Sequence, residues 1–159
     1  MVGNPGDVRA VNLDPSTGTL ADLRPRGMLV DSRARSPRAQ SAAGCYAVDA
    51  SVSEGDVGAR DGTLPIFAGG DEAVVAWLGP LFAHLGKATH MGAPHSGQSS
   101  KIANQIEVVS TVVGLGESVA FANAVGLDVP LFLDTVSKGA VSSRVMDIFG
   151  DHVLRREFG

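Results

Sequence analysis

The 159-residue sequence predicts an α/β fold in which a mixed first part is followed by an all-helical second part. Two observations support this prediction. Short β-type runs, separated by turn signals and helical pieces, occupy residues 1–95. Beyond residue 99 the chain carries apolar residues at helical spacing and has no proline before Pro130. We therefore expect two domains, residues 1–95 and residues 96–159.

Short apolar runs predict the strands of the first part. The first run is typical of a buried strand that ends in a polar residue, Asp31, and the second run is of the same type. Pro65, in the third run, cannot donate a backbone hydrogen bond, so that run is expected at a sheet edge or as a strand start. The candidate strands are residues 28–31, 46–50 and 64–68, with a short extended segment at His90 and Met91.

A first helix is predicted to begin after Asp71, whose side chain can accept a hydrogen bond from the first helical turn. Glu72 adds a negative charge that complements the helix dipole at this end. The apolar face of this helix is expected to comprise Val74, Val75, Leu78 and Leu81.

A long helix is predicted over residues 99–125, with Gly126 as its C-terminal stop. Asp128 and Pro130 then begin a second helix that runs to Val136, and residues 143–149 form a third. The long helix is expected to bury one apolar face. Its members are Ile102, Ile106, Val109, Val113 and Val119.

The composition excludes several classes of protein. Hydrophobic residues make up 44% and charged residues 19%, which excludes a wholly disordered chain. A net charge of -4 gives no general reason to expect nucleic acid or an anionic membrane as a partner. A local basic stretch fits either a solvated loop or a patch for an anionic ligand. It contains Arg24, Arg26, Arg33, Arg35 and Arg38.

Targeting and metal signals are weak. The lone cysteine, Cys45, excludes an internal disulfide and agrees with a reducing compartment. Gly3 and Pro5 interrupt any apolar run at the start, so no secretory signal is expected. No run approaches 18 uninterrupted apolar residues, so we expect no membrane span. No metal is expected either, because the histidines lack ligand spacing. They are His84, His90, His95 and His152.

The segment 97–105, Gly-Gln-Ser-Ser-Lys-Ile-Ala-Asn-Gln, is the strongest candidate for chemistry. Lys101, Asn104 and Gln105 form a polar patch near the start of the predicted long helix. Small residues precede the lysine, so the backbone there can approach a ligand closely. An ammonium and an amide placed together can bind a substrate oxygen. The alternative is a lysine that is simply a solvated surface charge.

A second candidate segment, residues 49–56, follows a predicted strand. Its hydroxyl and backbone N–H groups suit a small carboxylate, because ligands of α/β sheets bind at the carboxyl edge of the strands. The alternative is an ordinary turn rich in Ser, Gly and Asp. Gly114 and Gly116 do not form a dinucleotide loop, because the third glycine and the preceding strand are missing.

Taken in order, the segments resemble the β-hydroxyacid dehydrogenases, especially the 3-hydroxyisobutyrate dehydrogenase-like proteins of plants. Residues 49–55 are similar to the Asp-Ala-Pro-Val-Ser-Gly-Gly substrate loop of that family, and residues 97–105 to its catalytic signature. Residues 62–64 with 69–72, and residues 126–128, are similar to the blocks that follow. The resemblance spans nearly the whole chain.

The resemblance implies a partial Rossmann-type parallel sheet in residues 1–95, a long helix, and the beginning of an all-helical domain like that of 6-phosphogluconate dehydrogenase. It implies an oxidoreductase that exchanges a hydride between NAD or NADP and a small hydroxy acid or semialdehyde. The substrate within the family and the choice between NAD and NADP do not follow from the sequence.

The resemblance also assigns roles. Lys101 would be the catalytic residue, a general acid in reduction and, as the free amine, a base in oxidation. A free lysine has a pKa of about 10.4, so the second role requires burial to lower it. Ser53 and the neighbouring backbone N–H groups, including that of Gly55, would hold the substrate carboxylate, and Asn104 would orient the substrate.

The cofactor side is less complete. Val2 and Gly3 correspond to a strand end that passes the nicotinamide. The Gly-rich phosphate loop would lie before the first residue and the distal helices after the last, so we expect a chain truncated at both ends with negligible turnover. Ala34 stands where the family has a hydroxyl that faces the cofactor, and Ser51 replaces the loop proline.

Glu54, which replaces a glycine of the substrate loop, is the most serious departure. If its carboxylate faced a bound carboxylate from about 4 Å, the repulsion would be about 4 kcal/mol at an effective dielectric near 20. That energy corresponds to nearly three decades in affinity. If the side chain turns to solvent instead, only the cost of a backbone that prefers glycine remains.

The alternative function is a non-catalytic interaction module that associates with intact homologues through its helical part, and a homo-oligomer is expected on the same ground. The resemblance implies an intracellular location, mitochondrial or cytoplasmic. Neither nucleic acid nor a membrane is an expected partner.

Overall fold

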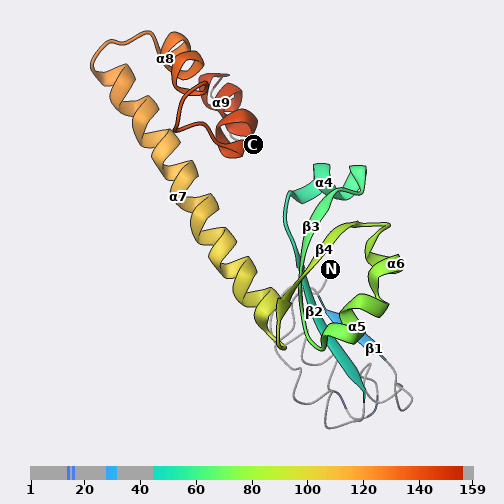
Figure 1. Ribbon diagram of the computed structural model, residues 1–159. Coiled ribbons are helices and arrows are strands. Elements are labelled where there is room, and N and C mark those ends of the chain that lie inside the picture. Colours follow the sequence, from blue (N-terminus) through green and yellow to red (C-terminus); the bar gives the residue numbers. More distant parts are fainter. Residues whose placement is uncertain (1–13, 15, 17–27, 32–44, 156–159) are drawn as a thin grey trace. The chain divides into compact units, whose positions relative to one another are not determined.

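The computed structural model describes residues 14, 16, 28–31 and 45–155, and these divide between two compact units, Met1–Ile102 and Ala103–Gly159 (Figure 1). The first unit holds a four-stranded sheet in the order β1-β2-β3-β4. The second begins inside the long helix α7. Its other helices are α8 and α9.

The sheet confirms the predicted strands and the Rossmann-type α/β class. Its strands are β1 (Met28–Asp31), β2 (Tyr46–Val52), β3 (Leu64–Gly69) and β4 (Gly86–Gly92). β1 pairs with β2 and β3 pairs with β4 in parallel.

The central pair, β2 and β3, is antiparallel, a detail that the alternation of strands and helices does not reveal. The connection, residues 53–63, contains only the short helix α4 (Gly55–Asp61) and is shorter than the dozen or so residues that a parallel crossover needs.

Pro65 marks a strand start rather than a sheet edge. It is the second residue of β3, and β3 lies between β2 and β4. Its carbonyl oxygen accepts a hydrogen bond from the backbone N–H of Ser53 at 3.0 Å. The first turn of the strand connection is therefore attached to the sheet at this point.

The predicted cap of α5 (Glu72–Trp77) is confirmed, because the Asp71 carboxylate accepts a hydrogen bond from the backbone N–H of Val74 at 3.1 Å. The predicted burial of Leu81 is wrong, since its side chain is 52% exposed. Gly79 and Pro80 start a new helix, α6 (Gly79–Phe82), which shifts the helical phase and buries Phe82 instead.

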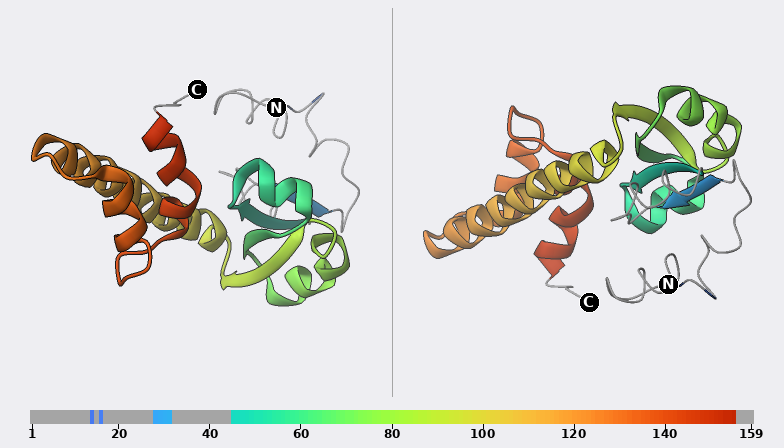
Figure 2. Two further views of the ribbon diagram at one scale, coloured as in Figure 1. Left: turned by 90° about the horizontal axis from the view of Figure 1, so that it is seen from above. Right: turned by 90° about the horizontal axis from the view of Figure 1, so that it is seen from below.

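The core of the first unit lies between the sheet and the helices α5 and α6, which sit on one side of it, with α4 toward the other (Figure 2). Apolar side chains of the two central strands alternate into this core, as expected for a half-covered sheet. The buried cluster comprises Val48, Ala50, Leu64, Ile66, Ala68, Val74, Val75, Leu78 and Phe82.

The second unit confirms the predicted helices. α7 (Ser96–Ala124) begins three residues before the predicted start, and Gly126 follows it with a φ of 79°, the left-handed conformation that favours glycine. Asp128 caps α8 (Val129–Val136) by accepting a hydrogen bond from the N–H of Leu131 at 2.9 Å. α9 (Arg144–Arg155) is longer than predicted. α8 and α9 fold back beside the later part of α7 (Figures 1 and 2).

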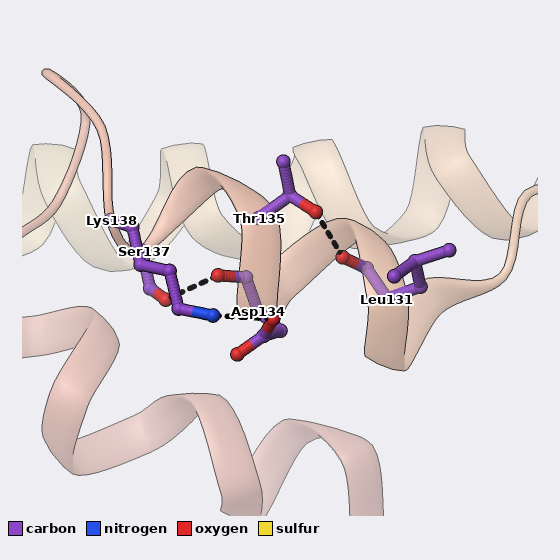
Figure 3. A network of polar contacts seen from close by, with 5 residues as sticks. All are labelled: Leu131, Asp134, Thr135, Ser137 and Lys138. Carbon is purple, nitrogen blue, oxygen red and sulfur yellow. Dashed lines mark hydrogen bonds and ion pairs between the residues drawn. The ribbon is translucent and has the colours of Figure 1, made fainter.

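Local polar contacts close the end of α8 (Figure 3). Thr135 Oγ1 donates to the carbonyl oxygen of Leu131 at 2.7 Å, and Ser137 Oγ donates to that of Asp134 at 3.0 Å. Lys138 Nζ lies 2.7 Å from Asp134 Oδ2, but both side chains are exposed. Such a pair contributes about 0–1 kcal/mol, so these contacts end the helix locally and do not make a site.

The predicted buried face of α7 is wrong for four of its five residues, and the fifth, Val119, is half-buried. Ile102 and Ile106 are each 64% exposed, Val109 is 57% exposed and Val113 is 50% exposed. The less exposed line of the helix contains Lys101, Asn104, Val108, Thr111, Leu115 and Ala122. Apolar residues occur all round α7, so periodicity alone does not select its covered face.

By length and composition, α7 could also cross a membrane. This is a weak signal, because core helices of water-soluble proteins meet the same criterion. Polar residues such as Lys101, Asn104 and Glu107 lie within the helix.

Candidate active site

Two predicted site residues meet in the first unit. Lys101 lies in the second turn of α7 and Ser53 directly after β2, and Lys101 Nζ donates to Ser53 Oγ at 3.5 Å. This distance is the outer limit of a hydrogen bond, so the contact is weak. An ammonium has three N–H donors, and a substrate oxygen beside the hydroxyl could take one of them.

Ser53 is held at the end of the sheet. Its backbone N–H is bonded to Pro65, and its side chain is half-buried. The chain then turns through two consecutive left-handed residues, Glu54 with a φ of 71° and Gly55 with a φ of 60°. This geometry is natural for glycine and strained for glutamate. The turn leaves Gly55 exposed, with no atom within 4 Å of where a Cβ would be.

The Glu54 side chain folds back over the first turn of α4. A Cβ placed on Gly58 would lie 2.9 Å from Glu54 Cβ and 3.4 Å from Glu54 Oε2. The helix dipole favours a negative charge at this end, although the carboxylate makes no capping hydrogen bond. Glu54 is exposed here, which supports the interpretation in which the backbone cost is its main effect.

Asp49 connects the sheet to the start of α7. Its side chain is 1% exposed. The backbone N–H of His95 donates to Asp49 Oδ1 and that of Gln98 to Oδ2, each at 2.8 Å. These charge-assisted bonds satisfy N–H groups that a helix start leaves without intrahelical partners.

Sequence reasoning missed this role of Asp49 and placed it in the substrate loop. The signal was present, because an acid between Val48 and Ala50 interrupts an otherwise apolar strand. A buried carboxylate there requires hydrogen-bond donors.

Two glycines allow this close contact. A Cβ on Gly97 would lie 2.3 Å from the carbonyl oxygen of Phe67 and 2.7 Å from that of Asp49. A Cβ on Gly69 would lie 2.6 Å from Asp49 Oδ1. Gly97 was expected to let the backbone approach a ligand, but the approach that requires it is to strands β2 and β3.

Partial burial lowers the pKa of Lys101 below its ordinary value, because desolvation disfavours the charged ammonium. The direction suits a group that must both donate and accept a proton. Asn104 is half-buried one turn further along α7, in the second unit, whereas Val2, Gly3 and Ala34 lie outside the described residues.

The predicted basic stretch also lies outside the described residues. Within residues 28–31 and 45–155, no three His, Cys, Asp or Glu side chains are grouped so that they could hold a metal ion.

Two family models match the chain. The NAD-binding domain of 6-phosphogluconate dehydrogenase matches residues 1–93. The NAD-binding domain of NADP-dependent 3-hydroxyisobutyrate dehydrogenase matches residues 95–159. Both agree with the expected cofactor class, NAD or NADP.

Individual proteins give the same result. The chain is 47% identical over 165 residues to a probable 3-hydroxyisobutyrate dehydrogenase-like protein of Arabidopsis thaliana, described as mitochondrial, covering 99% of this chain and 49% of the relative. A solved 3-hydroxyisobutyrate dehydrogenase of Mycobacterium tuberculosis with L-serine is 26% identical with a TM-score of 0.71, over 79% of this chain and 46% of that one.

The fold is matched more completely by Psf3 in complex with NADP+ and 2-OPP, with a TM-score of 0.85 and 22% identity, over 99% of this chain and 58% of that one. The chain thus spans about half the length of the curated relatives it matches.

Proposed function

The chain belongs to the β-hydroxyacid dehydrogenase family, and we propose that it carries the substrate-binding and proton-transfer side of a site that oxidises a small hydroxy acid or reduces its semialdehyde. The observation that carries this proposal is the contact between Lys101 Nζ and Ser53 Oγ at 3.5 Å. This contact supports the proposal, because an ammonium that can donate a proton lies beside a hydroxyl and a turn that could bind a carboxylate.

The described residues fit the substrate side of such a site. An ammonium and a hydroxyl beside a turn suit a carbonyl or alkoxide oxygen and a carboxylate. A dinucleotide could bind next to the substrate at the carboxyl ends of the parallel strands β1 and β2, because ligands of α/β sheets bind at that edge. A bound NAD or NADP would supply or accept the hydride.

Each residue then has a proposed role. In reduction, Lys101 donates a proton to the substrate oxygen, and in oxidation its neutral amine removes that proton. The lowered pKa of Lys101 increases the fraction of neutral amine at a given pH. Ser53 and the N–H of Gly55 bind the carboxylate, and Asn104 orients the substrate. Val2 and Gly3 are proposed for the nicotinamide side, and residues 1–95 and 96–159 for the two domains.

The proposal is tested by titrating the 159-residue chain with 3-hydroxyisobutyrate and monitoring its amide chemical shifts by NMR. We expect shifts at Ser53, Gly55 and Lys101, weaker binding of isobutyrate, which lacks the hydroxyl, and no difference between the two acids in Lys101→Met. Equal affinity for both acids in the unsubstituted chain would contradict the proposal.

Hydride exchange is tested separately by the absorbance of NAD(P)H with hydroxyisobutyrate or succinic semialdehyde. We expect negligible turnover from the 159 residues alone, because their sequence contains no Gly-x-Gly-x-x-Gly loop to hold the pyrophosphate. Turnover at ordinary enzyme rates that Lys101→Ala abolishes would contradict this expectation and would support the assignment of Lys101.

A second candidate function is association with a homologue or a second copy through α7. The observation in its favour is the exposure of Ile102, Ile106, Val109 and Val113. Light scattering of the chain, alone and mixed with an intact homologue, tests it. We expect an assembly that Ile106→Glu weakens and Gln105→Glu, a neighbouring exposed change, does not. A chain that stays monomeric both alone and in the mixture with the homologue would contradict this function.

The relative from Arabidopsis is described as mitochondrial, which supports an intracellular location for this chain, mitochondrial or cytoplasmic. Fractionation of cells that express the full gene product would test it.

A further inference from the structure

The geometry points to Asp49 as a positioning residue that sets the distance between Lys101 and Ser53. This inference rests on the proposed function for its catalytic meaning, but the placement itself is independent of any substrate. Asp49 and Ser53 belong to one continuous segment, since Asp49 lies within β2 and Ser53 directly follows it. Lys101 belongs to the helix whose start Asp49 binds.

The attachment of α7 to β2 is specific. Both carboxylate oxygens of Asp49 are used, one by the N–H of His95 and one by that of Gln98, and the side chain is 1% exposed. A group so buried and so bonded is not available to a substrate. Its effect on chemistry must therefore pass through α7, which makes it a positioning residue and not a catalytic one.

The lengths of the elements show why this attachment matters. Along an extended chain, Asp49 and Ser53 are separated by about 13 Å. From Gln98 to Lys101 the helix rises by about 4.5 Å, and the lysine side chain extends further. The two segments, which Asp49 joins at one end, meet again at the 3.5 Å contact between Lys101 Nζ and Ser53 Oγ. A shift of α7 by 1 Å, on the scale that is known to impair catalysis, would break that contact.

The glycines provide the second, independent observation. Gly97 and Gly69 lie so close to Asp49 that a Cβ on either would come within 2.8 Å of a carboxylate oxygen. The positive φ of 78° at His95, unusual for a residue with a side chain, occurs at one of the two bound N–H groups. Gly69 and Gly97 therefore have no room for a side chain, and His95 has a strained backbone. The contacts that Asp49 makes with this region explain all three restrictions.

The test follows the pH at which each lysine reacts with acetic anhydride, measured by peptide mass spectrometry. The sequence contains only Lys87, Lys101 and Lys138, so each can be quantified. In the unsubstituted chain we expect Lys101 to react at a pH below the ordinary lysine range, because partial burial lowers its pKa. In Asp49→Asn, which keeps one acceptor oxygen, and more so in Asp49→Ala, the pH midpoint of Lys101 should rise toward the ordinary lysine value, because a displaced helix start would expose the ammonium to water.

Asp71→Ala is the matched control. Asp71 caps α5 by the same type of bond in the same unit, without a link to α7. The Asp71→Ala variant is expected to be less stable, because α5 loses its cap, and to leave the pH midpoint of Lys101 unchanged. Circular dichroism establishes that each variant is folded, and Asp49→Asn, nearly the same size as aspartate, serves if Asp49→Ala is not.

The outcomes are distinct. A rise in the Lys101 midpoint in the Asp49 variants alone supports positioning. An unchanged midpoint overturns it. A lower midpoint also overturns it, because it would mean that the Asp49 charge acts directly on the ammonium and not through α7. No substrate or cofactor is present, so failure here differs from failure of hydroxyisobutyrate binding.

Discussion

Replacing Gly97 by alanine is expected to destabilise the first unit by about 2–5 kcal/mol. The new methyl group would lie 2.3 Å from the carbonyl oxygen of Phe67 and 2.7 Å from that of Asp49, and both are backbone atoms that cannot rotate away. Helix and strands would have to separate by about 1 Å to reach van der Waals distance. Overpacking of this kind costs about 1–3 kcal/mol, and weakening a charge-assisted hydrogen bond to Asp49 adds about 1–2 kcal/mol.

Gly114→Ala is the control on the same helix. Gly114 is exposed and a Cβ there would meet nothing within 4 Å. Alanine is preferred over glycine in a helix interior by about 1 kcal/mol, so this variant should be more stable than the original chain. The same chemical change is thus expected to have opposite signs at two positions of α7.

Urea unfolding followed by circular dichroism measures the free energy of unfolding. Because the chain divides into two compact units, amide hydrogen exchange should locate the effect in one of them. We expect faster exchange in β2 and β3 for Gly97→Ala and no change there for Gly114→Ala. A Gly97→Ala chain as stable as the original, with unchanged exchange in these strands, would refute the close contact between α7 and the sheet.

Further predictions concern Asp128 with Asp134, Lys101 and Glu54. Asp128→Ala removes the cap of α8 and should lower the stability of the second unit by about 1 kcal/mol, whereas Asp134→Ala, which removes an exposed ion pair, should change it by less than about 0.5 kcal/mol, as thermal unfolding would show. Because burial lowers the pKa of Lys101, the unfolded chain binds this proton more tightly, and stability should rise with pH from the folded pKa toward the ordinary one. Lys101→Met should remove that rise from a series of unfolding curves, and a rise that persists would contradict it. Glu54→Gly removes about 1–2 kcal/mol of strain from a left-handed glutamate but increases the freedom of the unfolded chain by about 0.5–1 kcal/mol, so thermal unfolding should show a gain in stability of up to about 1.5 kcal/mol. Glu54→Gln should leave carboxylate affinity within about threefold, and a gain near a thousandfold would mean that the carboxylate faces the ligand after all.

Local sequence signals predicted most of the elements. Asp71 and Asp128 each cap the helix that the sequence assigned to them, because a cap depends on a few neighbouring residues. Lys101 and Ser53 were assigned to one site through the resemblance of two short motifs to a family, and the structure has their side chains 3.5 Å apart. The helix caps required no knowledge of contacts between distant segments, whereas the pairing of Lys101 with Ser53 did.

Predictions that depend on distant contacts were less successful. The burial of Ile102 and Ile106 was wrong because α7 is apolar on all sides and its covered line is set by what packs on it. The antiparallel direction of β3 depends on the length of its connection, which alternating patterns do not encode. Asp49 escaped notice because its two partners lie 46 and 49 residues away in the chain.

The contact among Asp49, Gly69 and Gly97 also limits how the sequence can vary over time. A larger residue at either glycine meets the carboxylate, and a shorter or uncharged residue at Asp49 leaves N–H groups of α7 without their acceptor. Residues in such contact are expected to be energetically coupled, so no single substitution among them is neutral. An acid followed by glycines at this spacing should therefore persist in related chains whose lysine has been replaced, and would identify them as descendants after their chemistry has changed.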